Sequence, residues 1–314
     1  MTTLTQLEYL LAIDEHRHFG KAAKACHVSQ PSLSLQLQKL EEEIGATLFD
    51  RSKKPILATE IGKKIIAQAR RVIHEHKLIQ QLVDQDQIAG EFNLGIIPTL
   101  APYLIPLFVH EFASKLPMVK LNIIEMKTSE IVPAIKNDKL DGALLVTPLN
   151  DDQIIERTLF YEPFCLFHAE DHPLAKRKTI KIEDLKKYPS WLLEEGHCLR
   201  NQILNLCEIY DGANVLENVS FKSGNLETLL NLVRQNNGMT AITELARQRL
   251  PKSEREHLTK SFSKPIPTRE VSLISARAFL KEGIIEELES IIVKNLPAEL
   301  TSHKKGKIEV IPID

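Results

Sequence analysis

The hydrophobic positions of the first 60 residues follow the spacing of short helices. We predict three helices, which begin near Leu4, Phe19 and Gln30. Pro31 fits the first turn of the third helix because its missing N–H has no intrahelical partner to lose there, and Ser29 or Gln30 can cap the free N–H groups. The inward stripe of this third helix is apolar and consists of Leu33, Leu37, Leu40 and Ile44.

The opposite face of the third helix is predicted to be free for docking. At about 100° per residue, this face carries Pro31, Ser32, Ser34, Leu35, Gln38 and Lys39. Residues 48–57 then place apolar ends around a basic tip that contains a proline, which predicts a two-stranded wing. A polar helix face beside a basic wing is more than an ordinary solvated helix, and Arg51, Lys53 and Lys54 are placed to lie near phosphate groups.

A longer helix is predicted to begin after Thr59, which can cap it. Its apolar positions step alternately by four and three, which is the pattern of a heptad seam: Ile65, Ala69, Val72, His76, Ile79 and Val83. A seam of this kind predicts a dimer. The pattern ends near Gly90, where short apolar strands begin to alternate with helices.

The remainder of the chain predicts two α/β units. Strands at 92–97, 119–125 and 142–146 alternate with helices at 103–114 and 131–137. After Pro163, strands are predicted at 164–167, 191–193, 219–221 and 239–242, with helices at 199–210 and 226–235. A late strand at 271–274 and a helix at 284–293 return to the first unit. The predicted fold class is therefore two doubly wound α/β lobes, similar to periplasmic binding proteins, with a ligand cleft between them.

These elements give the expected domain boundaries. They are a winged helix-turn-helix domain over 1–58, a dimerisation helix over 59–89, an effector domain over 90–300 and a tail over 301–314. Within the effector domain, lobe I covers 90–162 and 268–300, and lobe II covers 163–267.

Composition limits the class of protein. The chain has 314 residues, of which 43% are hydrophobic and 26% charged, as in a soluble globular protein. A formal charge of −2 does not indicate a nucleic-acid binder, so phosphate contacts must come from small local clusters. We see no secretory signal at the start and no membrane span, because Pro98, Pro102 and Pro106 interrupt the one long uncharged stretch. A cytoplasmic protein is expected.

The chain contains four cysteines: Cys26, Cys165, Cys198 and Cys207. No pair has the CxxC spacing of a zinc site or a thioredoxin motif, and the histidines show no paired spacing, so we predict neither a metal nor a cofactor. Cys26 lies beside Ala22 and Ala23, and Cys165 lies in an apolar strand, so packing explains both.

The sequence resembles a known family at its N-terminal end. Residues 19–34, followed by 38–41 and 48–51, resemble the winged helix-turn-helix of LysR-type transcriptional regulators, and the predicted domains extend this resemblance over almost the whole chain. The resemblance implies binding to pseudo-palindromic sites on double-stranded DNA, self-association as dimers or tetramers, and contact with RNA polymerase. It implies DNA contacts by Ser29, Gln30, Pro31, Ser32, Ser34, Leu35, Gln38 and Arg51.

Within this family, residues 194–202 together with Cys207 resemble the stretch by which peroxide-sensing members detect hydrogen peroxide and control antioxidant genes. The resemblance implies that Cys198 reacts with peroxide and that Cys207 then joins it in a disulfide. It also implies peroxide-binding roles for four residues: Thr99, Thr128, His197 and Arg269. Those members commonly have Asp where this chain has Asn201.

The chemistry of a thiol is consistent with this role for Cys198. A thiol attacks peroxide as thiolate, and Cys198 stands at the start of a predicted helix, where free N–H groups favour an anion, with Arg200 close by in sequence. A continuous helix would hold Cys198 and Cys207 about 13 Å apart along its axis. Because a disulfide needs Cα atoms within about 7 Å, the intervening segment must unwind or fold back if the two thiols join.

Two other functions remain open from the sequence. In one, the regulator responds to a small metabolite in the interlobe cleft, and Cys198 is a small buried hydrophobic residue. In the other, the protein is a thiol peroxidase that turns over many times. The DNA-binding pattern of residues 1–87 argues against a dedicated enzyme.

Overall fold

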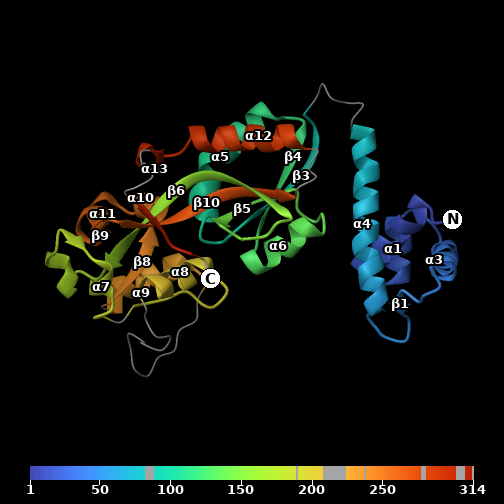
Figure 1. Cartoon of the computed structure of the whole chain (residues 1–314), viewed down its shortest axis with the longest axis horizontal. Helices are drawn as coiled ribbons and strands as arrows, with labels where there is room; N and C mark the ends of the chain where they lie inside the picture. Colours follow the sequence, from blue (N-terminus) through green and yellow to red (C-terminus); the bar gives the residue numbers. More distant parts are fainter. Residues whose placement is uncertain are drawn as a thin grey trace. The chain divides into compact units, whose positions relative to one another are not determined.

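The computed structural model divides the chain into two compact units, residues 1–87 and 88–314. The residues described are 1–81, 88–188, 190–207, 224–236, 238–276, 281–301 and 308–312. Figure 1 labels the helices and strands of both units.

The first unit is a small helical domain with a two-stranded wing. Its elements are α1 (Leu4–His16), α2 (Phe19–Ala25), α3 (Gln30–Ile44), β1 (Phe49–Asp50), β2 (Leu57–Ala58) and α4 (Glu60–Gln81). Strands β1 and β2 pair antiparallel, as the sequence predicted for the wing. The inward stripe of α3 is confirmed, because Leu33, Leu37 and Leu40 are fully buried in the core.

The capping of α3 also follows the sequence. Ser29 is the N-cap, its Oγ accepts a hydrogen bond from the Ser32 N–H (3.3 Å), and Pro31 occupies the first turn. Gly45 ends the helix with a φ of 73°, a left-handed conformation that glycine adopts without steric cost. Both ends of α3 are therefore fixed by local sequence.

Helix α4 carries two apolar faces, and the predicted seam is partly wrong. Ala69 is buried with Ile66 and Ile73 in the core of its own domain, where α4 packs on α1. Val72 and Ile79 remain on the open face, with 39% and 65% of their surface exposed. His76 is half-buried, and Val83 lies outside the described residues. The helix is confirmed, but Ala69 lies on the face that packs into the core of its own domain and not on the open face.

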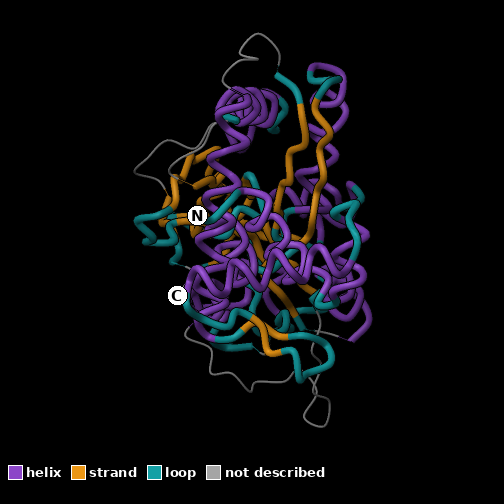
Figure 2. The backbone as a smooth tube through the Cα atoms, turned by 90° about the vertical axis from the view of Figure 1, so that its right-hand side faces the viewer, coloured by secondary structure: helices purple, strands orange, loops and turns teal. Residues whose placement is uncertain are grey.

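The first lobe of the second unit has a mixed sheet in the order β4-β3-β5-β10-β6. The strands are β3 (Gly90–Ile96), β4 (Val119–Glu125), β5 (Gly142–Thr147), β6 (Ile154–His168) and β10 (Ile266–Ala276). Strand β3 pairs in parallel with β4 and β5, whereas β10 pairs antiparallel with β5 and β6. Helices α5 (Ala101–Lys115), α6 (Thr128–Lys136) and α12 (Glu282–Lys294) accompany it. Figure 2 shows two long strands of the sheet running side by side.

The second lobe is built on the far half of β6. There β6 pairs antiparallel with β8 (Met239–Thr243) and β9 (Thr259–Phe262), and β9 pairs in parallel with β7 (Thr179–Ile180). Its helices are α7 (Ile182–Leu185), α8 (Cys198–Cys207), α9 (Leu226–Asn236), α10 (Glu244–Arg249) and α11 (Lys252–His257), with a 3-10 turn at Pro173–Lys176. Near the end of the chain lie α13 (Ala298–Thr301) and β11 (Ile308–Val310), which pairs with β10. The predicted two-lobed α/β architecture is confirmed.

Two of the strands predicted in the second lobe are not among its observed strands. Residues 191–193 do not form a strand. A parallel bridge between Ser190 and Met239, the hydrogen bond from the Trp191 N–H to the Met239 carbonyl (2.8 Å) and that from the Thr240 hydroxyl to the Trp191 carbonyl (2.8 Å) connect this segment to β8. The strand predicted at 219–221 lies outside the described residues. The mixed sheet also differs from a wholly parallel one, since β6 and β10 carry the chain between the lobes in opposite directions.

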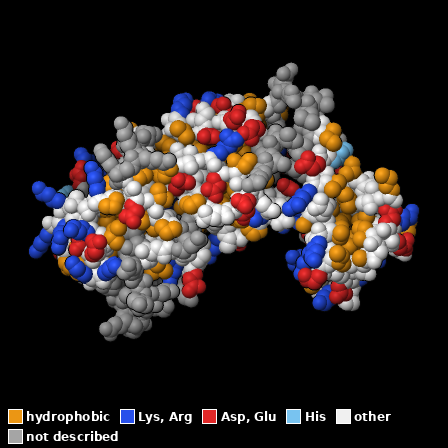
Figure 3. Space-filling model, viewed as in Figure 1, with side chains coloured by type: hydrophobic (Ala, Val, Ile, Leu, Met, Phe, Trp, Pro, Cys, Tyr) orange, Lys and Arg blue, Asp and Glu red, His pale blue; other side chains and the backbone are white. Residues whose placement is uncertain are grey.

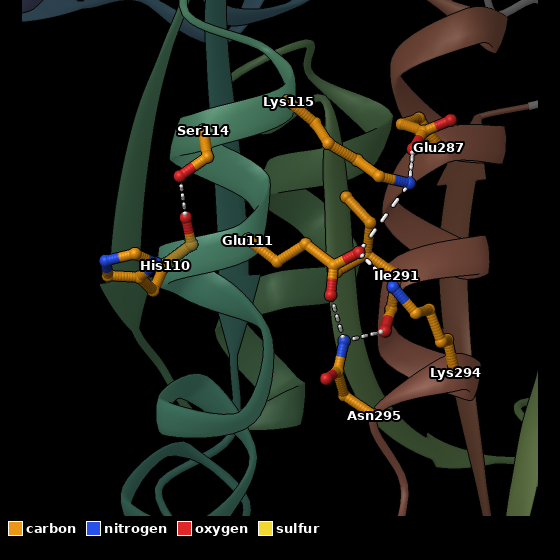
Figure 4. A network of polar contacts seen from close by, with 8 residues as sticks. All are labelled: His110, Glu111, Ser114, Lys115, Glu287, Ile291, Lys294 and Asn295. Carbon is orange, nitrogen blue, oxygen red and sulfur yellow. Dashed lines mark hydrogen bonds and ion pairs between the residues drawn. The ribbon is translucent and has the colours of Figure 1, made fainter.

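Polar side chains fasten α12 to α5 on the surface of the first lobe (Figure 4). The Glu111 carboxylate accepts hydrogen bonds from Lys294 Nζ (2.8 Å) and Asn295 Nδ2 (2.7 Å), and Lys115 Nζ lies 2.7 Å from Glu287. The two hydrogen bonds to Glu111 lower its pKa to about 2.

Candidate functional site

Cys198 occupies the first turn of α8 and connects the two lobes. Gly196 precedes it with a φ of 90°, and the Arg200 N–H donates to the His197 carbonyl (2.9 Å) to open the helix. The Cys198 Sγ lies 2.9 Å from the Oγ1 of Thr128, the first residue of α6 in the other lobe. The thiol is only 8% exposed and is free. It therefore lies where the N-terminal turns of two helices meet.

A buried guanidinium acts on this thiol through its positive charge. Arg269, on β10, is completely buried; its Nη1 donates to Thr99 Oγ1 (3.1 Å), and its Nη2 donates to the Thr99 carbonyl (3.3 Å). Thr99 lies in the turn between β3 and α5 and is 3% exposed. Because the Thr99 hydroxyl oxygen accepts from Arg269, its own proton points away from the guanidinium and is available to an acceptor elsewhere.

The surroundings of Cys198 act on its pKa in opposite directions. Burial is the largest influence and raises the pKa of the Cys198 thiol above its ordinary value, whereas the hydrogen bond with Thr128 and the positive charge of Arg269 oppose this rise. Arg200, the guanidinium nearest in sequence, instead donates its Nη1 to the Leu193 carbonyl (2.6 Å). The charge that favours a Cys198 thiolate thus comes from a residue 71 positions away, on β10.

His197 contributes an imidazole to the same segment. Its side chain is 4% exposed, and burial together with the charge of Lys127 lowers its pKa, so the ring is neutral near pH 7. Its Nε2 lies 3.8 Å from Glu194 and has no hydrogen-bond partner in the described part of the chain. Lys127 Nζ binds both Glu194 Oε1 (2.9 Å) and the Glu195 carbonyl (3.3 Å), which ties the start of α6 to the segment that precedes Cys198.

The structure brings most of the predicted redox site together. Thr128 contacts the thiol, Thr99 and Arg269 contact each other, and the charge of Arg269 acts on Cys198. Cys207 is the last residue of α8, nine positions and about 13 Å of helix axis from Cys198. Its side chain lies outside the described residues.

Sequence reasoning missed Glu162, which forms a buried ion pair with Arg269 (2.7 Å). The signal was present, because Glu162 is a lone carboxylate within the apolar stretch 159–167, which runs into the strand predicted at 164–167. A charge in such a place needs a buried partner. The sequence does not reveal which of the distant cations that partner is.

The predicted DNA-contacting residues lie on one face of the first unit. Ser29, Gln30, Pro31, Ser32 and Gln38 are exposed, Ser34 is half-buried, and Leu35 is 52% exposed. An exposed leucine on this face is not used for packing the domain.

Arg51, at the wing, is 43% exposed in its side chain and held in place. Its Nη2 binds Glu41 Oε2 (2.7 Å), and its guanidinium lies 5.5 Å from the centre of the Phe19 ring. These contacts fix the wing against α3, and they leave a large part of the guanidinium open to solvent.

Basic side chains are not concentrated on the first unit. On the face drawn in Figure 3, Lys and Arg gather over the end of the second unit that carries α7, where Lys176, Arg177, Lys178 and Lys181 are exposed. None of the described helices is long and apolar enough to cross a membrane. Within the same described ranges, no group of three or more His, Cys, Asp or Glu side chains is placed to hold a metal ion.

Comparison with protein families identifies the class of this chain. Residues 4–63 match the model of the bacterial regulatory helix-turn-helix proteins of the lysR family, and residues 85–282 match that of the LysR substrate binding domain. The chain belongs to the LysR family of DNA-binding transcriptional regulators, as its sequence motifs predicted.

Individual relatives show which members of the LysR family this chain is similar to. The hydrogen peroxide-inducible genes activator of Pectobacterium carotovorum subsp. carotovorum is 34% identical over 96% of this chain and 99% of its own length. A full-length cysteine-to-aspartate variant of OxyR from Pseudomonas aeruginosa is 31% identical, with a TM-score of 0.79 over 93% of this chain and 98% of that one. A cysteine-to-serine variant of Corynebacterium glutamicum OxyR with bound hydrogen peroxide is 26% identical, with a TM-score of 0.61 over 94% and 92%. The predicted similarity to the peroxide-sensing members is confirmed.

Proposed function

We propose that this protein is a cytoplasmic transcriptional regulator that senses hydrogen peroxide through Cys198, forms a disulfide with Cys207 and controls antioxidant genes. The observation that carries the proposal is the free, buried Cys198 thiol, which bonds Thr128 and lies in the field of Arg269. The names of the relatives, which include a peroxide-inducible genes activator and a peroxide-bound OxyR, support the same reading.

The first chemical step takes place at the Cys198 sulfur. Its thiolate attacks one peroxide oxygen, so that an S–O bond forms, the O–O bond breaks, and the departing hydroxide takes up a proton to become water. The Thr128 hydroxyl donates a hydrogen bond to the sulfur while the sulfur is a thiolate. Thr99, whose oxygen is fixed by Arg269, offers its hydroxyl proton to the peroxide, and His197 adds a neutral imidazole at the same helix start.

The second step links the two cysteines. The Cys207 thiolate attacks the sulfenic acid on Cys198, so that an S–S bond forms, the S–O bond breaks, and the departing hydroxide takes up a proton to become water. Because α8 is continuous from Cys198 to Cys207, the bond requires this helix to unwind or fold back. That change would release Leu199 and Ile203, which are buried in the reduced protein, and alter the packing between lobes.

The output of the switch is DNA binding. Ser29, Gln30, Pro31, Ser32, Ser34, Leu35 and Gln38 would face the major groove, with Arg51 on a phosphate. Self-association as a dimer or tetramer through the open face of α4 would match two half-sites of a pseudo-palindrome, and RNA polymerase would be the further partner. Such a regulator reacts about once per cycle and is not an enzyme that turns over peroxide.

Peroxide-dependent footprinting on a promoter that the protein binds tests this proposal. The wild-type footprint should change after peroxide treatment, and that of Cys198→Ser should not. Cys165→Ser is the matched control, because Cys165 is buried in β6 and burial also raises its pKa. A footprint that ignores peroxide but changes with a small metabolite would favour a metabolite-sensing regulator.

A further inference from the structure

Glu162 and Arg269 form an ion pair with both side chains fully buried. The two residues are direct cross-strand partners on the antiparallel strands β6 and β10. Glu162 Oε2 accepts from Arg269 Nε (2.8 Å) and lies 2.7 Å from Nη2, and Glu162 Oε1 accepts from the Leu245 N–H (2.8 Å) at the start of α10. Both carboxylate oxygens are therefore engaged, and the carboxylate has one fixed position.

This carboxylate determines where the guanidinium points. A guanidinium is planar and rigid, so a partner that holds Nε and Nη2 also fixes the direction of Nη1. In this direction Nη1 meets the Thr99 hydroxyl, and Nη2 also reaches the Thr99 carbonyl. Glu162 on one side and Thr99 on the other thus define the plane and position of Arg269.

From this geometry we propose that Glu162 is a positioning residue for the reaction of Cys198 with peroxide, because it holds Arg269 so that the guanidinium fixes the orientation of the Thr99 hydroxyl. The inference rests on the function proposed above for Cys198. Glu162 itself touches neither thiol nor peroxide in this account; it acts through Arg269 and Thr99.

A purely structural role does not account for the cost of burying the Glu162–Arg269 ion pair as well as a positioning role does. Taking two charges out of water is costly, and buried ion pairs are often replaced by apolar residues of similar size without loss of stability. The charge of Arg269, one member of the pair, also acts to lower the pKa of Cys198. A positioning role accounts for the cost, because a misplacement of about 1 Å in a reacting group can slow a reaction about 100-fold.

The test uses two substitutions of Glu162 in the full chain. Glu162→Gln keeps the shape and removes the charge, and Glu162→Asp keeps the charge but withdraws the carboxylate by about 1.5 Å, one C–C bond. Glu156→Gln is the matched control, because Glu156 lies on the same strand and accepts a backbone hydrogen bond from Leu149 (2.8 Å), but faces Ile274 across the sheet.

For each variant, the second-order rate constants of Cys198 with hydrogen peroxide and with iodoacetamide are measured by mass spectrometry of the Cys198 peptide. Iodoacetamide reports the access and ionisation of the thiol but has no departing oxygen for Thr99 to orient. Both Glu162 variants should therefore lose about 10- to 100-fold in the peroxide rate while the iodoacetamide rate changes far less. The Glu156 control should match the wild type in both reactions.

Each outcome decides the proposal. If Glu162→Gln does not fold, because Arg269 is left as an unpaired buried charge, Glu162→Asp still gives the ratio of the two rates. Equal changes in the two rates, or an unchanged peroxide rate in the folded variants, would overturn the role of Glu162. A wild-type Cys198 that shows no preference for peroxide over iodoacetamide would instead overturn the proposed sensing function, and the role of Glu162 with it.

Discussion

Replacing Thr128 by valine should slow the peroxide reaction by a predictable amount. Valine has nearly the same shape but cannot donate the hydrogen bond that the Thr128 hydroxyl makes to the Cys198 sulfur at 2.9 Å. Hydrogen bonds to charged groups contribute about 1.5–3 kcal/mol, and about 1.4 kcal/mol corresponds to one pKa unit. The pKa of Cys198 should therefore rise by roughly one to two units, because the thiolate loses a donor and the neutral thiol loses much less.

The rate constant for peroxide should follow the thiolate fraction. Near neutral pH it should fall about 10- to 100-fold in Thr128→Val, and most of this loss should disappear at a pH where both proteins are ionised. Because burial already raises the pKa of Cys198, stopped-flow measurements on the reduced protein run from pH 6 to the highest pH at which both proteins stay folded. Thr128→Ser is the control, since it keeps the hydroxyl. A loss of equal size at every pH, or no loss at all, would refute the argument that this hydrogen bond stabilises the thiolate.

Three further predictions address the DNA-binding unit and the stability of the effector unit. Ser34→Ala should change base preference, whereas Arg51→Ala should weaken binding to all sequences and flatten its salt dependence; equal effects of the two in a salt series would count against the assigned contacts. Ile79→Glu should shift the full chain toward monomers in sedimentation, because Ile79 is 65% exposed on the open face of α4, and an unchanged mass would exclude that face as an interface. The low pKa of Glu111, about 2 in place of an ordinary 4.5, stabilises the folded protein above about pH 4.5, and this contribution is lost as the pH falls toward 2. In urea unfolding, the free energies of wild type and Glu111→Gln should therefore converge as the pH is lowered from 5 to 3, and a difference that does not depend on pH would contradict the argument.

The sequence predicted correctly those elements that depend on contacts between residues close together in the chain. The stripe of Leu33, Leu37 and Leu40, the cap at Ser29 and the wing each depend on neighbours in sequence, and the structure has all three. The start of α8 at Cys198 belongs to the same group, because the hydrogen bonds of its first turn involve residues only a few positions apart.

Long-range contacts decided the features that were wrong or missed. Ala69 fits a heptad seam equally well by spacing, but α1 packs against that side of α4 and buries it. The strand expected at 191–193 is apolar enough, but an isolated bridge at Ser190 and hydrogen bonds of Trp191, and not a ladder of paired residues, connect it to β8. The pairing of Arg269 with Glu162 depends on the register of two strands more than 100 residues apart in sequence, which no local pattern encodes.

The central claim is that peroxide joins Cys198 to Cys207 within one chain. Its most direct test is mass spectrometry of the protein digested without reductant after treatment with one equivalent of hydrogen peroxide. The account predicts a cross-linked peptide pair that contains Cys198 and Cys207, absent before treatment and absent from Cys198→Ser, while Cys207→Ser stops at a sulfenic acid on Cys198. Wild-type protein that shows no such pair, together with a Cys207→Ser variant that still changes its DNA footprint with peroxide, would contradict the account.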